Sequence, residues 1–396
     1  MGLKLFFQTF LALRLMAGLA AGHAVDFAKC QFPTSNALKG CPKGTIVVGT
    51  NTDVASFQTI QGAIDALPNN ETPYTILVLA GNYTEQLNVT RQAPVTILGQ
   101  TTNPRSRAQN LVTVSWASAN GHGSGFNDNA YTSVLTVAPT LNASLVGSGP
   151  TGFNVSQDTP FGNSDFRVYN INFQNTFAQQ TAGPSHAVGV SRANAGFYFC
   201  GFYSYQDSVY IGHLGNAYFY ANEIAGQVDF LYGFGTAWIE SSNLTLRGCG
   251  GGITAWKGTN TTFSNKYGCY VSNSYIRGAN ESVVESNRGK CSLGRPWNSL
   301  HRSVYINTFM DATIRPQGYT GWGTPTPPNS TFMAEYGSYG PGWSLEGRMD
   351  GNATRVLTRH AVWPYHQPNN VFMKADGGQP YVGWIDKRFR SPWAGA

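Results

Sequence analysis

The sequence predicts an all-β fold, a single-stranded right-handed parallel β-helix (solenoid) with a short N-terminal capping helix. The first observation is composition. Only 12% of the 396 residues are charged, about half the usual share, whereas Gly (46), Phe (23) and Tyr (20) are abundant. The second is a series of short apolar segments with no helix of crossover length between them, which excludes a doubly wound sheet. The third is a repeat of about 20 residues in the middle of the chain, a period that indicates a solenoid.

The repeat is visible in three successive aromatic segments, which begin at Phe197, Tyr218 and Trp238. Each coil of a solenoid buries its inward side chains only against neighbouring coils, so both ends of the stack need caps. A β-propeller would instead require a four-stranded repeat of roughly 40 residues, and the sequence contains no such period.

The capping helix is predicted at residues 56–67, where apolar residues recur on one helical face. Ser56 is the expected N-cap and Pro68 ends the helix. The apolar face consists of Phe57, Ile60, Ile64 and Leu67. This helix would cover the N-terminal end of the stack.

Short strands are predicted wherever apolar residues cluster between turn-forming residues. They cover residues 75–79, 95–98, 111–116, 134–137, 166–173, 188–190, 197–199, 217–220, 237–239, 253–255, 270–276 and 303–306. No linker or low-complexity segment interrupts the series, so we expect one continuous β-helix domain over residues 44–365.

The segments at the two ends of the chain are expected to differ from the solenoid. Residues 1–24 have the lysine, the apolar run and the small residues of a secretory signal peptide. A cysteine-containing segment at 25–43 follows, and the tail at 366–396 is expected to pack on the solenoid or cap it. The glycosylation sequons, which support secretion of a glycoprotein, are Asn70, Asn82, Asn88, Asn142, Asn154, Asn243, Asn260, Asn280, Asn329 and Asn352.

The chain contains six cysteines, an even number that suggests disulfides in an oxidising compartment. Cys30 and Cys41 are close together before the regular part of the chain, and we predict that they pair. The other four are left unassigned, with Cys200 as a candidate buried thiol. Because no C-x-x-C or H-x-x-x-H spacing occurs, a zinc site is not expected.

Two aspartates, Asp207 and Asp229, lie 22 positions apart in similar surroundings. This separation is one coil of the predicted solenoid, so their carboxylates should stack on one outer face at about the 4.8 Å spacing of neighbouring strands. At that distance one carboxyl group stays protonated and serves as an acid, while the other stays anionic and can attack. Gln206 can donate to a developing oxyanion, an effect worth roughly 3 kcal/mol. His186 is expected in the same column, one coil earlier.

Other functional classes have little support in the sequence. There is no G-x-S-x-G element of a serine α/β-hydrolase and no G-x-x-x-x-G-K-[ST] phosphate loop. The net charge of +6 is compatible with an acidic substrate, but it is too weak to indicate nucleic-acid binding.

Three elements resemble those of the pectin methylesterases. Residues 205–210 are similar to Y-Q-D-T-L-Y, residues 226–233 are similar to G-x-V-D-F-I-F-G, and residues 293–297 are L-G-R-P-W unchanged. The three elements occur in the order and spacing of that family. The resemblance extends from about residue 44 to about residue 365, and three matched elements in order make it specific.

The resemblance implies hydrolysis of the methyl esters of polygalacturonate (pectin), with release of methanol and with no metal or cofactor. Asp229 would be the nucleophile, and Asp207 would be the proton donor and acceptor. Gln206 would stabilise the oxyanion, and Arg295 would orient Asp229 and keep it ionised.

The substrate-binding residues implied by the resemblance are Trp297, which would form a wall for a sugar ring, together with His186, Phe230, Tyr205 and Tyr232. The partner would be pectin in the plant cell wall. We expect a secreted monomer with no nucleic-acid contact and no membrane contact after signal cleavage.

His186 departs from the family pattern, which usually has Gln before Ala-Val, whereas here His186 precedes Ala187-Val188. Gln donates an amide hydrogen at any pH, but the number of donors on His depends on its protonation. We therefore hypothesise that activity depends on the ionisation of His186.

Two alternatives to the esterase remain open at this stage. One is another pectin-active β-helix enzyme, a lyase or a glycosidase, since carboxylates about 5 Å apart also suit a retaining glycosidase. The other is a non-catalytic wall-binding homologue.

Overall fold

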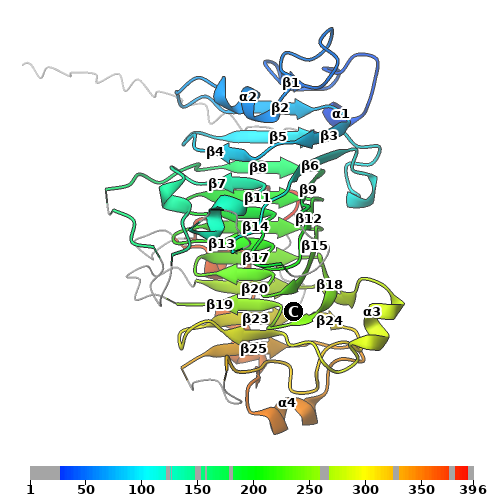
Figure 1. The fold of residues 1–396 in the computed structure, drawn as a ribbon, viewed down its shortest axis with the longest axis vertical. Helices are drawn as coiled ribbons and strands as arrows, with labels where there is room; N and C mark the ends of the chain where they lie inside the picture. The colour runs from blue at the N-terminus through cyan, green and yellow to red at the C-terminus, as the bar shows by residue number, and fades with distance from the viewer. Residues whose placement is uncertain are drawn as a thin grey trace, which may run out of the picture.

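The computed structural model forms a parallel β-helix whose strands stack in three long sheets (Figure 1). It describes residues 27–121, 125, 127–147, 153–156, 158–177, 182–258, 267–323, 330–373 and 380–390. Every pairing between the named strands is parallel, and the order of strands in each sheet follows the order of the coils. The right-handed β-helix predicted from the sequence is thus confirmed. The predicted signal peptide lies outside the described residues.

The three sheets differ in length. The 11-stranded sheet contains β1 (Ile46–Val48), β2 (Tyr74–Val78), β5 (Val95–Gly99), β8 (Phe166–Tyr169), β11 (Asn194–Tyr198), β14 (Asn216–Tyr220), β17 (Thr236–Glu240), β20 (Gly268–Ser272), β23 (Arg302–Ile306), β25 (Phe332–Tyr336) and β26 (Arg355–Val356). The 8-stranded sheet contains β3 (Gly81–Thr84), β6 (Val112–Trp116), β9 (Ile171–Asn175), β12 (Gly201–Tyr203), β15 (Glu223–Val228), β18 (Asn243–Gly250), β21 (Tyr275–Gly278) and β24 (Phe309–Met310). The 7-stranded sheet contains β4 (Leu87–Val89), β7 (Leu135–Val137), β10 (Val188–Val190), β13 (Val209–Ile211), β16 (Leu231–Gly233), β19 (Thr254–Trp256) and β22 (Gly294–Pro296).

Helices occupy the ends and the connections. The α-helices are α1 (Ala28–Gln31), α2 (Ile60–Asp65), α3 (Glu281–Ser286), α4 (Leu345–Gly351), α5 (Arg359–Val362) and α6 (Pro368–Val371). The 3-10 helices are η1 (Arg107–Gln109), η2 (Asn129–Thr132), η3 (Asn142–Ser144) and η4 (Trp363–Tyr365). In the described part of the chain, no helix has the length and apolar character needed to cross a membrane.

The coils turn at corners where single residues adopt positive φ. Between the 11-stranded and 8-stranded sheets, Asn170 (φ 55°) and Asn273 (φ 47°) hold such corners. The expected strands at 166–173 and 270–276 are therefore wrong as single strands, because each is divided at its asparagine into two. Asparagine tolerates this left-handed conformation better than most residues do, so the sequence marks the corner with a residue that can adopt it.

The helix α2 lies at the N-terminal end of the stack, as expected of a cap (Figure 1). It begins later than predicted, because the side chain of Thr59 rather than Ser56 accepts the capping hydrogen bond from the Gly62 amide. Ser56 instead donates its backbone N–H to the Val47 carbonyl at 2.9 Å, which holds this part of the chain in extended form. Ile60, on the predicted apolar face, is fully buried in the core.

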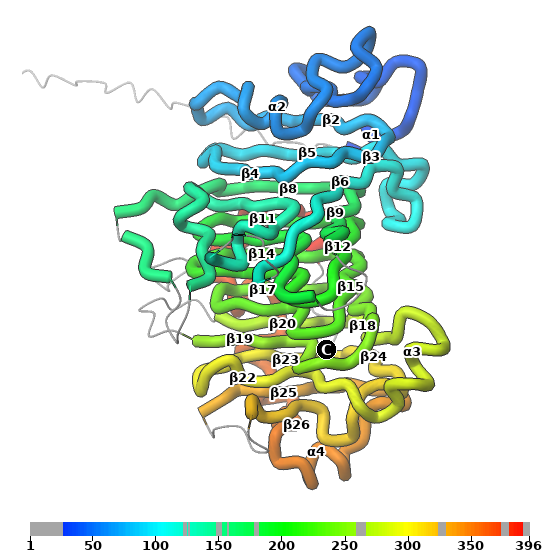
Figure 2. Tube along the Cα trace, in the orientation of Figure 1, coloured from blue at the N-terminus to red at the C-terminus, as the bar shows by residue number. Residues whose placement is uncertain are grey.

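Two of the three hydrophobic clusters in the described residues extend along the stack and stabilise it. One fills the interior of the coils, and the other covers the outer face of the 11-stranded sheet. The second cluster includes Trp384 and Ile385 from the C-terminal segment, and Figure 2 shows red C-terminal segments behind the stacked coils. Asp386 fixes this segment, because its backbone N–H donates to the Tyr198 hydroxyl at 2.8 Å and its carboxylate accepts from the Tyr169 hydroxyl at 2.7 Å.

Candidate active site

The predicted aspartate pair lies at the corner between the 8-stranded and 7-stranded sheets. Val209 pairs with Leu231 in parallel register, and Asp207 and Asp229 each precede these residues by two positions. Both aspartates have positive φ, 60° and 46°, so the same backbone turn presents each carboxyl group in successive coils. Neighbouring parallel strands are about 4.8 Å apart, which places the two buried carboxyl groups side by side.

A guanidinium group is bonded to only one of the two carboxylates. Arg295, on β22, donates from Nε to Asp229 Oδ1 at 3.0 Å and from Nη2 to Oδ2 at 2.5 Å. The backbone N–H of Gly252 donates to Oδ1 at 3.0 Å. The side chain of Asp207 has no hydrogen-bond partner within the described residues. The pair is therefore asymmetric, with one anchored carboxylate and one available acid.

The electrostatics follow the same asymmetry. Burial and the negative charge of Asp229 raise the pKa of Asp207 well above its usual value, and the charge of Arg295 only opposes this rise. Burial also raises the pKa of Asp229, but the hydrogen bonds and charge of Arg295 and the Gly252 amide counteract it. Asp207 is thus the group that keeps its proton, and Asp229 is the group that ionises more readily.

The space around the ion pair depends on a glycine that the sequence analysis did not single out. Gly251 has φ +59°, and a Cβ at this position would lie 2.5 Å from Asp229 Oδ1 and 2.8 Å from Arg295 Cζ. Any side chain here would displace the pair. The run of three glycines at 250–252 was the available signal, because such a run marks a close backbone approach.

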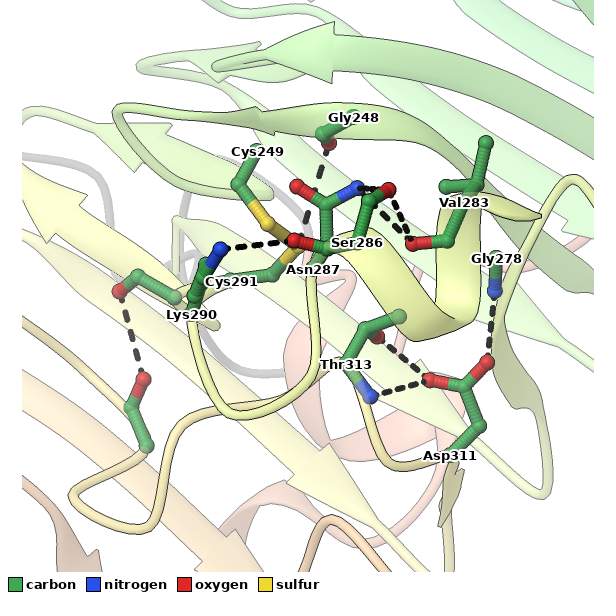
Figure 3. The surroundings of a disulfide bond; sticks show 12 residues. Gly248, Cys249, Gly278, Val283, Ser286, Asn287, Lys290, Cys291, Asp311 and Thr313 are labelled. Atoms are coloured by element: carbon green, nitrogen blue, oxygen red, sulfur yellow. Dashed lines mark hydrogen bonds between the residues drawn. A yellow bond between two sulfur atoms is a disulfide. The ribbon is translucent and has the colours of Figure 1, made fainter. Parts of the chain in front are cut away.

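A disulfide fastens the two segments that carry these groups. Cys249 and Cys291 are joined between the end of β18 and the loop after α3 (Figure 3). Cys249 lies two residues before Gly251, and Cys291 lies four residues before Arg295. The predicted Cys30–Cys41 disulfide is present as well, whereas Cys200 and Cys269 are buried free thiols.

Gln206 and two predicted aromatic residues surround the pair. Gln206 is partly exposed and pairs with Val228 in the next coil. Within the described residues, its side-chain amide has no hydrogen-bond partner. Tyr205 is partly exposed beneath the guanidinium of Arg247, which lies 4.7 Å from the ring centroid. Trp297 is also partly exposed and packs 5.5 Å from Tyr232.

Three predicted substrate-binding residues are buried, and one of them, Tyr232, is only 3% exposed. Phe230 is fully buried in the interior core, because the turn at Asp229 directs the next side chain inward, so its ring cannot meet a ligand. His186 is in the expected column but is also fully buried, and burial lowers its pKa to about 3. The imidazole is therefore neutral at ordinary pH, and we withdraw both its direct contact with substrate and the dependence of activity on its ionisation.

Two further residues near the site were missed by the sequence analysis. The ammonium group of Lys257 lies 3.7 Å from the ring centroid of Trp297, and burial lowers the pKa of this lysine to about 8. The ring of Trp322 lies 3.8 Å from Cζ of Arg295. Neither residue belongs to a repeated segment, so the period gave no signal for them. Among the described residues, no three His, Cys, Asp or Glu side chains gather as a metal site would require.

A protonated carboxyl group beside an ion-paired carboxylate provides the acid and the nucleophile that a hydrolytic enzyme needs. Comparisons with known proteins identify the family. The sequence model described as Pectinesterase matches residues 135–373. A pectinesterase of Aspergillus aculeatus is 32% identical over 359 residues, which cover 88% of this chain and 93% of that protein. The chain belongs to the pectinesterase family of carboxylic ester hydrolases.

Solved structures agree on the fold. The pectin methylesterase from Aspergillus niger superposes with a TM-score of 0.67 at 24% identity, covering 88% of this chain and 98% of that one. A pectin methylesterase in complex with a hexasaccharide superposes with a TM-score of 0.61 at 23% identity, covering 82% and 96%.

Proposed function

We propose that the protein demethylates methyl-esterified polygalacturonate through a covalent intermediate on Asp229. The observation that carries this proposal is the asymmetry of the aspartate pair. Arg295 donates to Asp229 from Nε and Nη2 at 3.0 and 2.5 Å, whereas the carboxyl group of Asp207 keeps its proton. Such a pair separates the two roles that ester hydrolysis requires, a nucleophile and a proton donor.

In the first step, a carboxylate oxygen of Asp229 attacks the ester carbonyl carbon, and the carbonyl oxygen becomes an oxyanion. The free amide of Gln206 donates a hydrogen bond to this oxyanion, an interaction worth roughly 3 kcal/mol. The C–O bond to the methoxy group then breaks, and Asp207 transfers its proton to the departing oxygen. Methanol leaves, and an acyl anhydride remains on Asp229.

In the second step, Asp207 is an anion and acts as the base. It takes a proton from a water molecule, whose oxygen attacks the acyl carbon. The bond from that carbon to the Asp229 oxygen breaks, and the product leaves as a carboxylic acid that gives its proton to solvent. Asp207 is again protonated and Asp229 is again ionised, so the cycle closes without a metal or cofactor. The partly exposed rings of Tyr205 and Trp297 are the proposed contacts for sugar rings on either side of the reacting ester, with Tyr232 packed beside Trp297.

We further propose that the enzyme is a secreted monomer that acts on pectin in the plant cell wall and binds neither nucleic acid nor membrane. The predicted signal peptide and the sequons support secretion. The net charge of +6 favours association with an acidic polymer. The hexasaccharide complex of the related structure supports an oligosaccharide partner.

Two products measured on highly methylated pectin test the proposal. We expect methanol to be released with no shortening of the polymer, because the site cleaves an ester and leaves glycosidic bonds intact. Chain shortening without methanol would favour a lyase or a glycosidase. Binding to pectin with neither product would favour a wall-binding protein.

A further inference from the structure

Three successive coils place a lysine between two aromatic residues at the end of the 7-stranded sheet. The strands β16, β19 and β22 pair in parallel register and end at aligned positions. The residues that directly follow these strands are Phe234, Lys257 and Trp297. The ammonium group of Lys257 lies 5.0 Å from the ring centroid of Phe234 and 3.7 Å from that of Trp297. The register of the sheet therefore puts a cation between two aromatic rings.

The backbone holds this arrangement in place. The N–H of Lys257 donates to the Gly233 carbonyl at 2.9 Å, and the N–H of Trp297 donates to the Trp256 carbonyl at 3.1 Å. Lys257 is fully buried, whereas Trp297 is partly exposed. Lys257 therefore contacts the indole from the protein side, and the exposed part of the ring is the part that a ligand can reach.

The ammonium group is charged at neutral pH although it is buried. Burial lowers the pKa of Lys257 to about 8, and the charge of Asp128 opposes this effect. The Asp128 carboxylate is itself fixed, because it accepts from the backbone N–H groups of Ala130, Val146 and Gly147 at 2.8, 3.0 and 2.8 Å. The attraction between a cation and an aromatic face is strongest for tryptophan and increases when the pair is shielded from water. The charge of Lys257 thus holds the Trp297 ring.

The other titratable groups packed around this column do not change charge in the same pH range. The His213 ring lies 5.8 Å from the Phe234 ring, and burial and the charge of Arg192 lower the pKa of His213, so its imidazole is neutral there. Burial raises the pKa of Tyr232, which packs beside Trp297, well above its usual value. Of these groups, Lys257 is the one that loses a proton as the pH rises through about 8.

We propose that Lys257 is a positioning residue that holds the Trp297 indole in the orientation that receives a sugar ring, so that substrate binding weakens when the ammonium group is deprotonated. The proposal rests on the esterase function proposed above and on the sugar contact assigned there to Trp297. Lys257 is buried and acts on the substrate only through the indole. Its loss should therefore change KM and leave the reacting aspartates, and hence kcat, unaffected.

Steady-state kinetics on a methyl-esterified oligogalacturonate test this role. Lys257→Met keeps an unbranched side chain but removes the charge, and at neutral pH it should raise KM about 5- to 30-fold and change kcat less than about 2-fold. Lys257→Arg keeps a cation that stacks on aromatic rings, and its KM should stay within about 3-fold of that of the unmodified enzyme. The control Arg355→Met removes an arginine that lies 5.6 Å from the Phe332 ring on the 11-stranded sheet and should change neither constant.

The pH dependence of KM separates the charge of Lys257 from its packing. Between about pH 7 and about pH 9.5, KM of the unmodified enzyme should rise about 5- to 30-fold as the cation is lost. KM of Lys257→Arg should stay level, because the guanidinium remains charged. The same pH dependence of KM in both proteins would overturn the proposal, and so would a Lys257→Met variant that loses kcat at unchanged KM.

Thermal unfolding of each variant identifies any loss that comes from the fold. Replacing a buried charged group by an apolar side chain of similar size is often tolerated, so we expect Lys257→Met to remain folded. If it did not fold, the pH dependence of Lys257→Arg would still decide the question.

The Trp297 ring gives a readout that does not depend on turnover. In protein labelled with 5-fluorotryptophan, the 19F signal of Trp297, assigned by its absence in Trp297→Phe, should shift with pH through a midpoint of about 8. This shift should be absent in Lys257→Met and in Lys257→Arg. A signal that is static in the unmodified enzyme, or that shifts equally in all three proteins, would overturn the proposal.

The two measurements also separate this role from the esterase function. If the unmodified enzyme releases no methanol while the Trp297 signal follows the charge of Lys257, the esterase function fails and the hold of Lys257 on the indole stands. If methanol is released and the signal is independent of Lys257, only the positioning role fails.

Discussion

Two of the carboxylate–guanidinium pairs in the described part of the chain have nearly equal contact distances and different surroundings. Asp229 and Arg295 are 2.5 Å apart, and the arginine side chain is 25% exposed. Glu335 and Arg348 are 2.6 Å apart, and their side chains are 1% and 0% exposed. Arg348 is also saturated by protein, because it donates to the Pro316 carbonyl at 2.6 Å. The contact between the charges is similar, so the surroundings determine what each pair does.

The difference lies in what stands beside each carboxylate. Asp229 has the carboxyl group of Asp207 beside it in the preceding coil, and its arginine partner is 25% exposed, so this pair is closer to solvent than the other. Glu335 lies on β25, where Arg348 reaches it from α4 at the C-terminal end of the stack. A sealed pair of this kind contributes to the arrangement of the fold, and breaking it leaves one buried charge without a partner.

The largest expected effect comes from removing the negative charge of Asp229. Asp229→Asn should lower kcat by at least about 10⁴-fold, because it removes the nucleophile, while the protein remains cooperatively folded. Methanol release and thermal unfolding measure the two quantities. The matched control is Asp165→Asn, since Asp165 is paired with Arg167 at 2.6 Å far from the site. An Asp229→Asn variant with turnover near that of the control would contradict the assigned role.

Removing the charge of Glu335 should affect the stability of the fold rather than catalysis. Glu335→Gln should lower the free energy of unfolding by about 3–5 kcal/mol, because the guanidinium of Arg348 would remain buried without its counter-charge. The kcat/KM of the folded fraction should stay unchanged. Denaturant unfolding and a methanol assay on the same preparation check both statements. A loss of turnover with full stability would show that the two pairs are not separate in function.

The sequence predicted the solenoid because its long strands are rich in aromatic and β-branched residues at a regular period. It did not predict most three-residue strands of the 7-stranded sheet, such as β13 and β16. Strands this short have little pattern of their own, and stacking on neighbouring coils holds them in place. The corners were missed for a similar reason, because Asn170 and Asn273 lie inside runs that otherwise alternate as strands do.

The sequence period and the family motifs predicted only part of the site. The stacking of Asp207 and Asp229 followed from their separation, and the place of Arg295 from the family resemblance. Neither the period nor the motifs predicted which side chains point into the core and which point to the surface. The positive φ of Asp229 (46°) breaks the alternation of the strand, so Phe230 and Leu231 both enter the core. The burial of His186 depends on residues of a different coil, which the sequence does not bring together.

The Cys249–Cys291 disulfide should help to align the Asp229–Arg295 pair and should have no effect on the Glu335–Arg348 pair. The double variant C249A/C291A should lose about 2–4 kcal/mol of stability, since its disulfide spans 42 positions. Its kcat should fall about 10- to 100-fold if Gly251 and Arg295 lose their alignment. The control C30A/C41A removes a disulfide at the other end of the chain and should lose stability alone. Equal kcat in the two double variants would contradict a role of Cys249–Cys291 in the site.

A more conservative substitution separates the geometry of the Asp229–Arg295 pair from its charge. Arg295→Lys keeps a positive charge but cannot form two parallel hydrogen bonds to a carboxylate. We expect kcat/KM to fall about 10- to 100-fold, because one charge-assisted hydrogen bond contributes about 1.5–3 kcal/mol. The equivalent Arg167→Lys in the pair with Asp165 should leave kcat/KM unchanged.

The pH profile of the Arg295→Lys variant should reveal the cause of the loss. Asp229 must be ionised to attack, burial raises its pKa, and the hydrogen bonds of Arg295 lower it. Removing part of the lowering influence raises the pKa, so a larger fraction of Asp229 is protonated at a given acidic pH. The acid limb of kcat/KM should therefore move to higher pH, while the alkaline limb, which reports loss of the Asp207 proton, should move less. An acid limb that stays in place would mean that Arg295 orients the nucleophile without controlling its ionisation.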